Sequence, residues 1–261
     1  MNSVKYYKLN KQPLLFVLAE FRFPIIMKME GLIPELQDRF RAKLPYFEEQ
    51  LSQEVKLQSQ GIEVSSSKQW NFIDKERKHA IVINPSRIIC ISSHYDRFEG
   101  FSSFCLDSIR ILKEVAAPAF VERVGLRYGD LITPIEGSPI SDLVQSNLCN
   151  ISYLSDVGEL SHKLSEISLK TSEGNMMIRS LYGEHNLSVL PDVVNLPIKI
   201  NLAETSSERI ILDSDHVWES GDEKELTFEE EAILSKLKDM HLLSREAFWS
   251  CTTEKGRELW K

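Results

Sequence analysis

The fold of this chain is decided by a stretch in its middle, Glu122-Arg123-Val124-Gly125-Leu126-Arg127-Tyr128-Gly129-Asp130. Apolar residues alternate with others along it, which predicts a β-strand because successive side chains of a strand point to opposite faces. Val124, Leu126 and Tyr128 share one face. Arg123 and Arg127 share the other, with a glycine between them that leaves the backbone open to an approaching group. Because arginine is costly to bury, two arginines on one strand face predict a carboxylate, a phosphate or a partner that meets them.

The residues before this strand predict a β-strand, a helix, three antiparallel strands and a second helix. Proline brackets the first strand, apolar residues recur at helical spacing in both helices, and turn residues separate the three strands. We expect strands over residues 14–23, 69–74, 78–84 and 87–94, and helices over 32–44 and 101–115.

The second part of the chain continues in the same manner. We expect the central strand over residues 120–132, a short helix over 139–148, and strands over 164–170, 176–181, 196–202 and 209–217. Thr227 and Glu230 have the spacing of a capping box, which predicts the start of a long helix. Thr252 or Thr253 can cap a last helical turn.

The order of elements is similar in residues 1–118 and 119–261. Phe21-Arg22-Phe23 parallels Leu126-Arg127-Tyr128, and a glutamate follows the arginine eight residues later in one part and nine in the other. We therefore predict an α+β fold in one compact unit, a large curled antiparallel sheet built from two similar β-α-β(n)-α halves with helices packed on one face. Arg123 and Arg127 would stand on the other, uncovered face.

The composition is typical of a globular protein, with 42% hydrophobic and 27% charged residues. The sequence contains no run of about 18 apolar residues, so it predicts no transmembrane helix. The first residues lack the apolar core of a signal peptide, so we expect a cytoplasmic protein without a membrane partner. Cys90, Cys105, Cys149 and Cys251 are far apart in the sequence, which favours small core residues over disulfides or a zinc site.

The net charge of −8 comes from one segment. Nine acidic residues and a single lysine lie between Asp213 and Glu231, so the rest of the chain is electrically neutral. A neutral surface does not supply the broad cationic patch that duplex nucleic acid requires. The acidic segment either faces a basic partner or forms a solvated loop and helix start.

Short motifs spread along the chain resemble those of a known family. They are Arg123-Val124-Gly125-Leu126-Arg127-Tyr128, Glu20-Phe21-Arg22-Phe23-Pro24, Phe98-Glu99-Gly100-Phe101, Ile211-Leu212-Asp213-Ser214-Asp215 and the tail around Met240-His241. The chain resembles a sporadically distributed, functionally uncharacterised bacterial and archaeal family of about 260 residues with a central R-x-G-L-R-Y motif. That family usually carries an apolar residue and asparagine after the tyrosine, where this chain has Gly129 and Asp130. The resemblance implies a prokaryotic origin and a mobile module such as antiviral defence or a toxin-antitoxin system, and it transfers no activity.

The arginine face is the first candidate site. In one interpretation its arginines are planar donor forks for an anionic ligand or a partner's carboxylates. In the other, Glu20 and Arg22 of the first strand, with Glu122 and Asp130 nearby, complete a structural ion-pair network with these arginines. The candidate binding residues are Arg123, Arg127, Tyr128, Asp130, Arg22 and Glu20.

Asp213 and Asp215 form the second candidate site. Strand alternation places both on one face, where they can hold a divalent cation with outside ligands, while His216 points away. The alternative is a pair of strand-end carboxylates without a metal. His241, beside the apolar stripe of the last long helix, is expected to be a hydrogen-bonded, partly buried histidine rather than a general base.

Aromatic residues supply the third candidate. Six of them can either line a cavity for one small ligand under a curled sheet or pack in the core. They are Trp70, Phe72, Tyr95, Phe98, Phe101 and Tyr128.

No nucleophile elbow, phosphate-binding glycine loop, zinc-protease motif or dinucleotide fingerprint occurs, so no cofactor is expected. The sequence favours a cytosolic, non-catalytic binding or interaction protein whose partner is another protein or a small anionic ligand. The alternative is an enzyme acting on a nucleotide or RNA phosphate. In that case Arg123 and Arg127 line the cavity, and Asp213 and Asp215 hold a metal.

Overall fold

The computed structural model describes residues 6–58, 61–135, 137–200, 205–221 and 225–261, and for residues 52–58, 61–67 and 152 it describes the backbone alone. The first part contains β1 Leu14–Arg22, α1 Met29–Phe40, β2 Tyr46–Gln58, β3 Gly61–Ile73, β4 His79–Asn84, β5 Arg87–Ser92 and α2 Phe98–Ala116. The second part contains β6 Phe120–Val121, β7 Arg123–Ile132, α3 Ile140–Leu143, α4 Ser146–Cys149, η1 Ser152–Leu154, β8 His162–Thr171, β9 Gly174–His185, η2 Pro191–Val193, β10 Ser207–Glu219, β11 Leu226–Thr227, α5 Glu230–Cys251 and α6 Glu254–Leu259.

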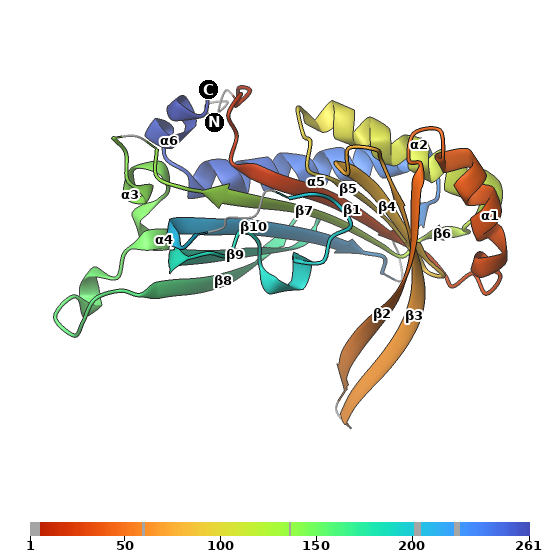
Figure 1. Cartoon of the computed structure of the whole chain (residues 1–261), viewed down its shortest axis with the longest axis horizontal. Helices are drawn as coiled ribbons and strands as arrows, with labels where there is room; N and C mark the ends of the chain where they lie inside the picture. The colour runs from red at the N-terminus through yellow and green to blue at the C-terminus, as the bar shows by residue number, and fades with distance from the viewer. Residues whose placement is uncertain (1–5, 59–60, 136, 201–204, 222–224) are drawn as a thin grey trace.

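Nine strands form one antiparallel sheet in the order β2-β3-β4-β5-β1-β7-β10-β9-β8 (Figure 1). The sheet is open, with β2 and β8 at its two edges. β1 and β7 lie side by side in its middle, with Arg22 opposite Arg123 and Glu20 opposite Gly125. The predicted α+β class with a large antiparallel sheet is confirmed, and the predicted central strand is β7 together with the short β6.

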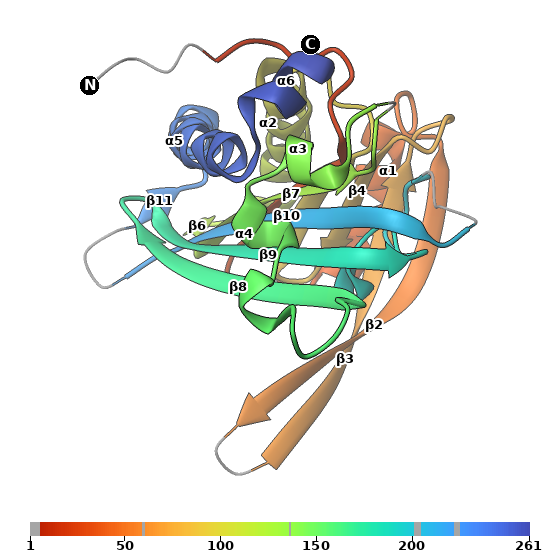
Figure 2. The same cartoon turned by 90° about the vertical axis from the view of Figure 1, so that its left-hand side faces the viewer.

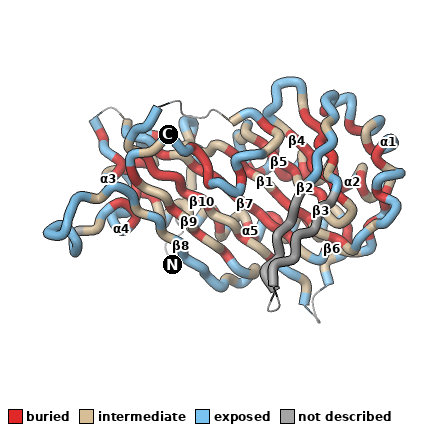
Figure 3. The backbone as a smooth tube through the Cα atoms, turned by 60° about the horizontal axis from the view of Figure 1, so that its bottom comes forward, coloured by how far each residue is buried: buried red, intermediate tan, exposed pale blue. Residues whose placement is uncertain are grey.

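Helices α1, α2 and α5 lie over one face of the sheet (Figures 1 and 2). Between them and the sheet lies the largest apolar cluster, to which β1 contributes Phe21 and β7 contributes Val124 and Leu126. Buried residues follow the central strands, as Figure 3 shows. The alternation in the sequence thus predicts correctly which face of β7 is buried, because its apolar residues pack against the helices.

The opposite face of the sheet is partly covered. Val189, Leu190 and Val193 are buried there against Phe16 and Ile211. The strand predicted over residues 196–202 is wrong for residues 196–200, and residues 201 and 202 lie outside the described part. Pro197, which lacks an N–H, interrupts any strand pairing there, and the apolar residues of this segment pack on the sheet instead.

β2 was not predicted, and β3 begins earlier than its predicted strand. The two pair along their whole length, from Tyr46 opposite Ile73 to Gln58 opposite Gly61, and form an arm that extends away from the sheet (Figures 1 and 2). The sequence of the arm is rich in serine, glutamine and charged residues. Apolar residues alternate with charged ones only over short stretches, Val55-Lys56-Leu57 and Ile62-Glu63-Val64, which are too short for a half-buried strand to be recognised.

Helix starts show where local signals fail and where they hold. The predicted capping box is wrong, because Thr227 pairs with Phe120 in a two-stranded ladder and α5 begins at Glu230, with Glu229 as its N-cap. Thr253 does cap a helix, since its Oγ1 accepts from the Gly256 N–H at 3.0 Å. Within the described ranges, none of the helices combines the length and the apolar character needed to cross a membrane.

Candidate ligand-binding site

The arginine face is filled with ion pairs. Nε of Arg127 donates to Oδ2 of Asp213 at 2.8 Å, and its Nη1 donates to Oδ2 of Asp192, also at 2.8 Å. Arg179 bonds the same two carboxylates. Because the side chains of Arg127 and Asp213 are only 8% and 1% exposed, their charges compensate each other away from water.

A second ion-pair group surrounds Glu20 on the same face. Its carboxylate accepts from Nε of Arg22 at 2.8 Å and from Nη1 of Arg87 at 3.3 Å, and it also pairs with Arg123. Arg123 reaches Glu219 as well, at 3.5 Å. Four predicted binding residues, which are Glu20, Arg22, Arg123 and Arg127, are therefore bonded to carboxylates or arginines of the chain itself.

Asp213 and Asp215 do share a face, as predicted, opposite Gly129 and Arg127 of β7. Both oxygens of Asp213 accept from arginines, and burial raises the pKa of Asp215. His216 lies on the other face, with Nε2 at 2.9 Å from Oγ1 of Thr171. In the part of the chain that the structure describes, no three His, Cys, Asp or Glu side chains are placed to hold a metal ion.

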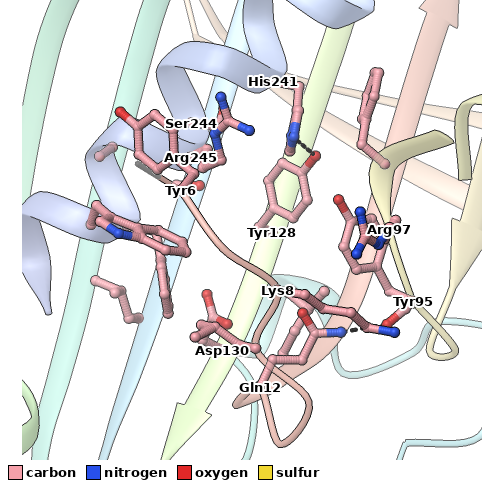
Figure 4. A pocket seen from close by; sticks show the side chains of 18 of the residues that line it. Tyr6, Lys8, Gln12, Tyr95, Arg97, Tyr128, Asp130, His241, Ser244 and Arg245 are labelled. Atoms are coloured by element: carbon pink, nitrogen blue, oxygen red, sulfur yellow. Dashed lines mark hydrogen bonds between the residues drawn. The ribbon is translucent and has the colours of Figure 1, made fainter. Parts of the chain in front are cut away.

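Tyr128 and Asp130 belong to a different place, because strand alternation turns them toward the helices. They line a pocket of about 240 Å³ between the sheet, the N-terminal residues 6–14, the start of α2 and the last turns of α5 (Figure 4). The predicted binding residues are thus divided between the two faces of β7.

Aromatic side chains form much of the pocket wall. Of the six predicted, Tyr95, Phe98 and Tyr128 line it, while Trp70, Phe72 and Phe101 are buried in the core. Their rings are fixed by each other, since Tyr95 and Tyr128 meet edge to face with centroids 6.0 Å apart. The pocket also draws aromatic residues from distant segments, which are Tyr6, Tyr7, Phe248 and Trp249.

The Asp130 carboxyl points into this pocket (Figure 4). The residue is only 6% exposed, and among the described residues no hydrogen bond or opposite charge stabilises its carboxylate. Burial, together with the charge of Asp213 behind it, raises the pKa of Asp130 to about 8. Its oxygens keep a small surface toward the pocket, and a carboxyl that is so far removed from water without a partner in the protein costs free energy of folding.

His241 and Tyr128 are joined by a hydrogen bond of 2.8 Å between Nδ1 and the phenol oxygen (Figure 4). The imidazole also stacks on Phe98, with centroids 4.2 Å apart and planes 6° from parallel. Burial, and then the charge of Arg245, lowers the pKa of His241 to about 4. The prediction of a hydrogen-bonded, partly buried histidine is confirmed, and the ring is neutral at neutral pH.

Arginines lie on either side of Tyr128 in the view of Figure 4, Arg245 from α5 and Arg97 from the start of α2. The Arg245 guanidinium lies over the ring of Tyr6 at 3.9 Å from its centroid. Its Nε is buried, and no acceptor among the described residues reaches it. Among the residues that line the pocket, the Asp130 carboxyl and the Arg245 guanidinium thus have no charged partner in the described part of the chain.

The N-terminal segment is held across the pocket by contacts with distant parts of the chain. Lys8 pairs with Asp96, and Gln12 donates to the Tyr95 carbonyl. At the other end of the sequence, the hydroxyl of Tyr7 donates to Glu258 at 2.9 Å, and the N–H of Lys11 donates to the Trp260 carbonyl at 2.8 Å. These contacts hold the N-terminal segment in place, and that segment closes one side of the pocket.

Sequence reasoning missed Arg245 and placed Asp130 beside the arginine face. Two signals were present. The i, i+2 spacing of Tyr128 and Asp130 puts them on one strand face, and the i, i+4 spacing of His241 and Arg245 puts them on one helix face. No local signal, however, indicates that these two faces meet.

No protein-family model matches the chain, and a search of the curated proteins found none that matches it.

Proposed function

We propose that the protein is a non-catalytic binding protein for a small ligand, which occupies the pocket between β7, α5 and the N-terminal segment. The observation that carries this proposal is the buried Asp130 carboxyl, which has no partner among the described residues. Such a group destabilises the ligand-free fold, and a ligand that donates to it offsets that cost.

The ionisable groups of the pocket support binding rather than acid–base catalysis. Burial raises the pKa of Tyr128 and lowers that of His241, so both side chains are held in their neutral forms. Neutral phenol and imidazole groups serve well as hydrogen-bonding walls. The enzyme alternative finds less support, because Arg127 and Asp213 are bonded to each other and neither lines the pocket.

The proposal extends to the origin of the fold. Outward from the β1–β7 pair, the strand order is β5, β4, β3 on one side and β10, β9, β8 on the other, with β2 as an addition to the first side. This symmetry supports a degenerate duplication of residues 1–118 and 119–261. The cytoplasmic location, a protein partner, the family resemblance and a defence role stay predictions.

Native mass spectrometry of the protein purified from its own host tests the proposal. We expect the wild-type protein to carry a small-molecule adduct that is lost in Asp130→Leu, which replaces the carboxyl by an apolar group of similar size. Asp192→Asn, which changes a carboxyl on the other sheet face, is the matched control and should keep the adduct. A wild-type protein that carries no adduct, and gains none from a soluble extract of its host, contradicts the proposal.

A further inference from the structure

The two unpaired polar groups of the pocket indicate what a ligand must offer. Asp130 needs hydrogen-bond donors, because its carboxyl has no partner among the described residues while it is 6% exposed. Arg245 needs an acceptor for its terminal N–H groups, because it lines the pocket and its guanidinium has no carboxylate partner in the described part of the chain, while its fully buried Nε is out of reach of a ligand. A ligand that satisfies both carries donors at one position and an acceptor, preferably charged, at another.

The walls between these groups indicate the shape of the ligand. Tyr95 and Tyr128 border the pocket with rings fixed edge to face, and Trp249 lines it with its indole packed edge to face against Tyr6, centroids 5.2 Å apart. Rigid aromatic walls around a narrow cavity favour a flat, apolar ring over a branched or flexible chain.

The charges of the pocket are balanced and separated. Lys8, Arg97 and Arg245 line it together with Asp96, Glu99 and Asp130. Lys8 and Asp96 neutralise each other in an ion pair. A ligand with a single charged end and nothing else therefore leaves either the arginine or the buried carboxyl unmatched.

We propose that the ligand is a flat heteroaromatic ring with N–H donors that bond Asp130, carrying an anionic group that bonds Arg245. This inference rests on the proposed function and specifies its ligand class. Two sources share this chemistry. A guanine mononucleotide offers a ring N–H beside an exocyclic amine, which a carboxylate accepts in parallel, and an indole carboxylate offers a single ring N–H.

Isothermal titration calorimetry at pH 7 with GMP, AMP, indole-3-acetate and spermidine tests the class. We expect GMP or indole-3-acetate to bind, and whichever binds identifies the source. AMP, whose ring nitrogen accepts where that of guanine donates, should bind at least about 10-fold more weakly than GMP if the nucleotide is the source. Asp130→Asn and Arg245→Gln should each weaken binding about 10-fold or more, whereas Arg39→Gln on α1, remote from the pocket, should leave it unchanged.

Proton release on binding distinguishes a ligand-bonding role of Asp130 from a structural one, because a structural role would release no proton. A carboxyl with a raised pKa must lose its proton to the solvent before it can accept two N–H donors. GMP binding at pH 7 should therefore release up to about one proton per ligand, measured from the dependence of the binding enthalpy on the buffer. Asp130→Asn should abolish this release.

The outcomes separate the class from the function. Binding of spermidine alone, or binding of GMP and indole-3-acetate that Asp130→Asn and Arg245→Gln leave unchanged, overturns the ligand class. If neither heteroaromatic anion binds while native mass spectrometry shows an adduct that depends on Asp130, the class is wrong and the binding function stands. If there is no such adduct either, both proposals fail.

Discussion

Asp130 and Asp213 lie on adjacent strands and are both buried, but their surroundings differ. Asp213 accepts from Arg127 and Arg179, whereas among the described residues nothing bonds the carboxyl of Asp130. Paired buried charges hold a fold together when both partners are present, and a buried carboxyl without a partner weakens it. The same sheet therefore carries a structural carboxylate on one face and, in our proposal, a ligand-binding one on the other.

Replacement of Arg127 tests the structural role of the arginine face. We expect Arg127→Ala to lower the free energy of unfolding by up to about 3–5 kcal/mol, because among the described residues Asp213 then keeps only Arg179 as an ion-pair partner. Arg22→Ala is the comparison. The Arg22 side chain is 41% exposed, and its loss should cost about 0–1 kcal/mol. Urea denaturation measures both, and equal losses would show that burial of the network has no energetic importance.

At the scale of elements, the close pairing of β1 and β7 depends on a glycine. A Cβ built on Gly129 would lie 2.1 Å from the ring of Phe16, whereas one built on Gly125 would meet nothing nearer than 3.6 Å. The backbone at Gly125, between the two arginines, is therefore not reserved for an approaching group. Gly129 is the position where the missing side chain is required by packing.

Two matched glycine variants test this contact. Gly129→Ala should destabilise the fold by about 1–3 kcal/mol, because the ring of Phe16 and the strand behind it must move. Gly125→Ala makes ordinary contacts and reduces the freedom of the unfolded chain, so it should leave stability unchanged or raise it by up to about 1 kcal/mol. Thermal unfolding followed by circular dichroism compares the two. A larger loss for Gly125→Ala would contradict the described packing of β1 on β7.

At the scale of the whole molecule, the sequence predicted the helices and strands better than the contacts between them. Period-two alternation placed Val124 and Leu126 toward the helices and Arg127 away from them, because alternation depends on the strand alone. The partner of Arg127 was not readable. Asp213 reaches it through the register of β10 on β7, which is set by packing and not by local residues. Of the residues that line the pocket, Tyr95, Phe98, Tyr128, Asp130 and His241 were singled out from the sequence, but not as one site.

The pocket as a whole could not be predicted from spacing. Tyr6, Asp130 and Arg245 are far apart in the sequence, and the pocket exists because the N-terminal segment is tied to Glu258 and Trp260 at the other end of the chain. Such contacts between termini leave no periodic signal in either segment. The arm of β2 and β3 was missed for a related reason, since its pairing is accompanied by apolar alternation only over short stretches.

The most direct test of the central claim is the stability of Asp130→Asn against that of the wild-type protein as a function of pH. The pKa of Asp130 is raised to about 8 in the folded protein and is about 3.9 in an unfolded chain. Between these values the folded state binds more protons, so the wild-type protein loses stability as pH rises.

Asparagine has no such titration, and the effects of His241 are common to both proteins and cancel in the difference. We expect Asp130→Asn to be the more stable protein at pH 8. Its advantage should shrink toward pH 5 by up to about 1.4 kcal/mol per pH unit. A variant that is less stable than the wild-type protein at pH 8 would show that the Asp130 carboxylate already has its partners within the chain, and would contradict a site that waits for a ligand.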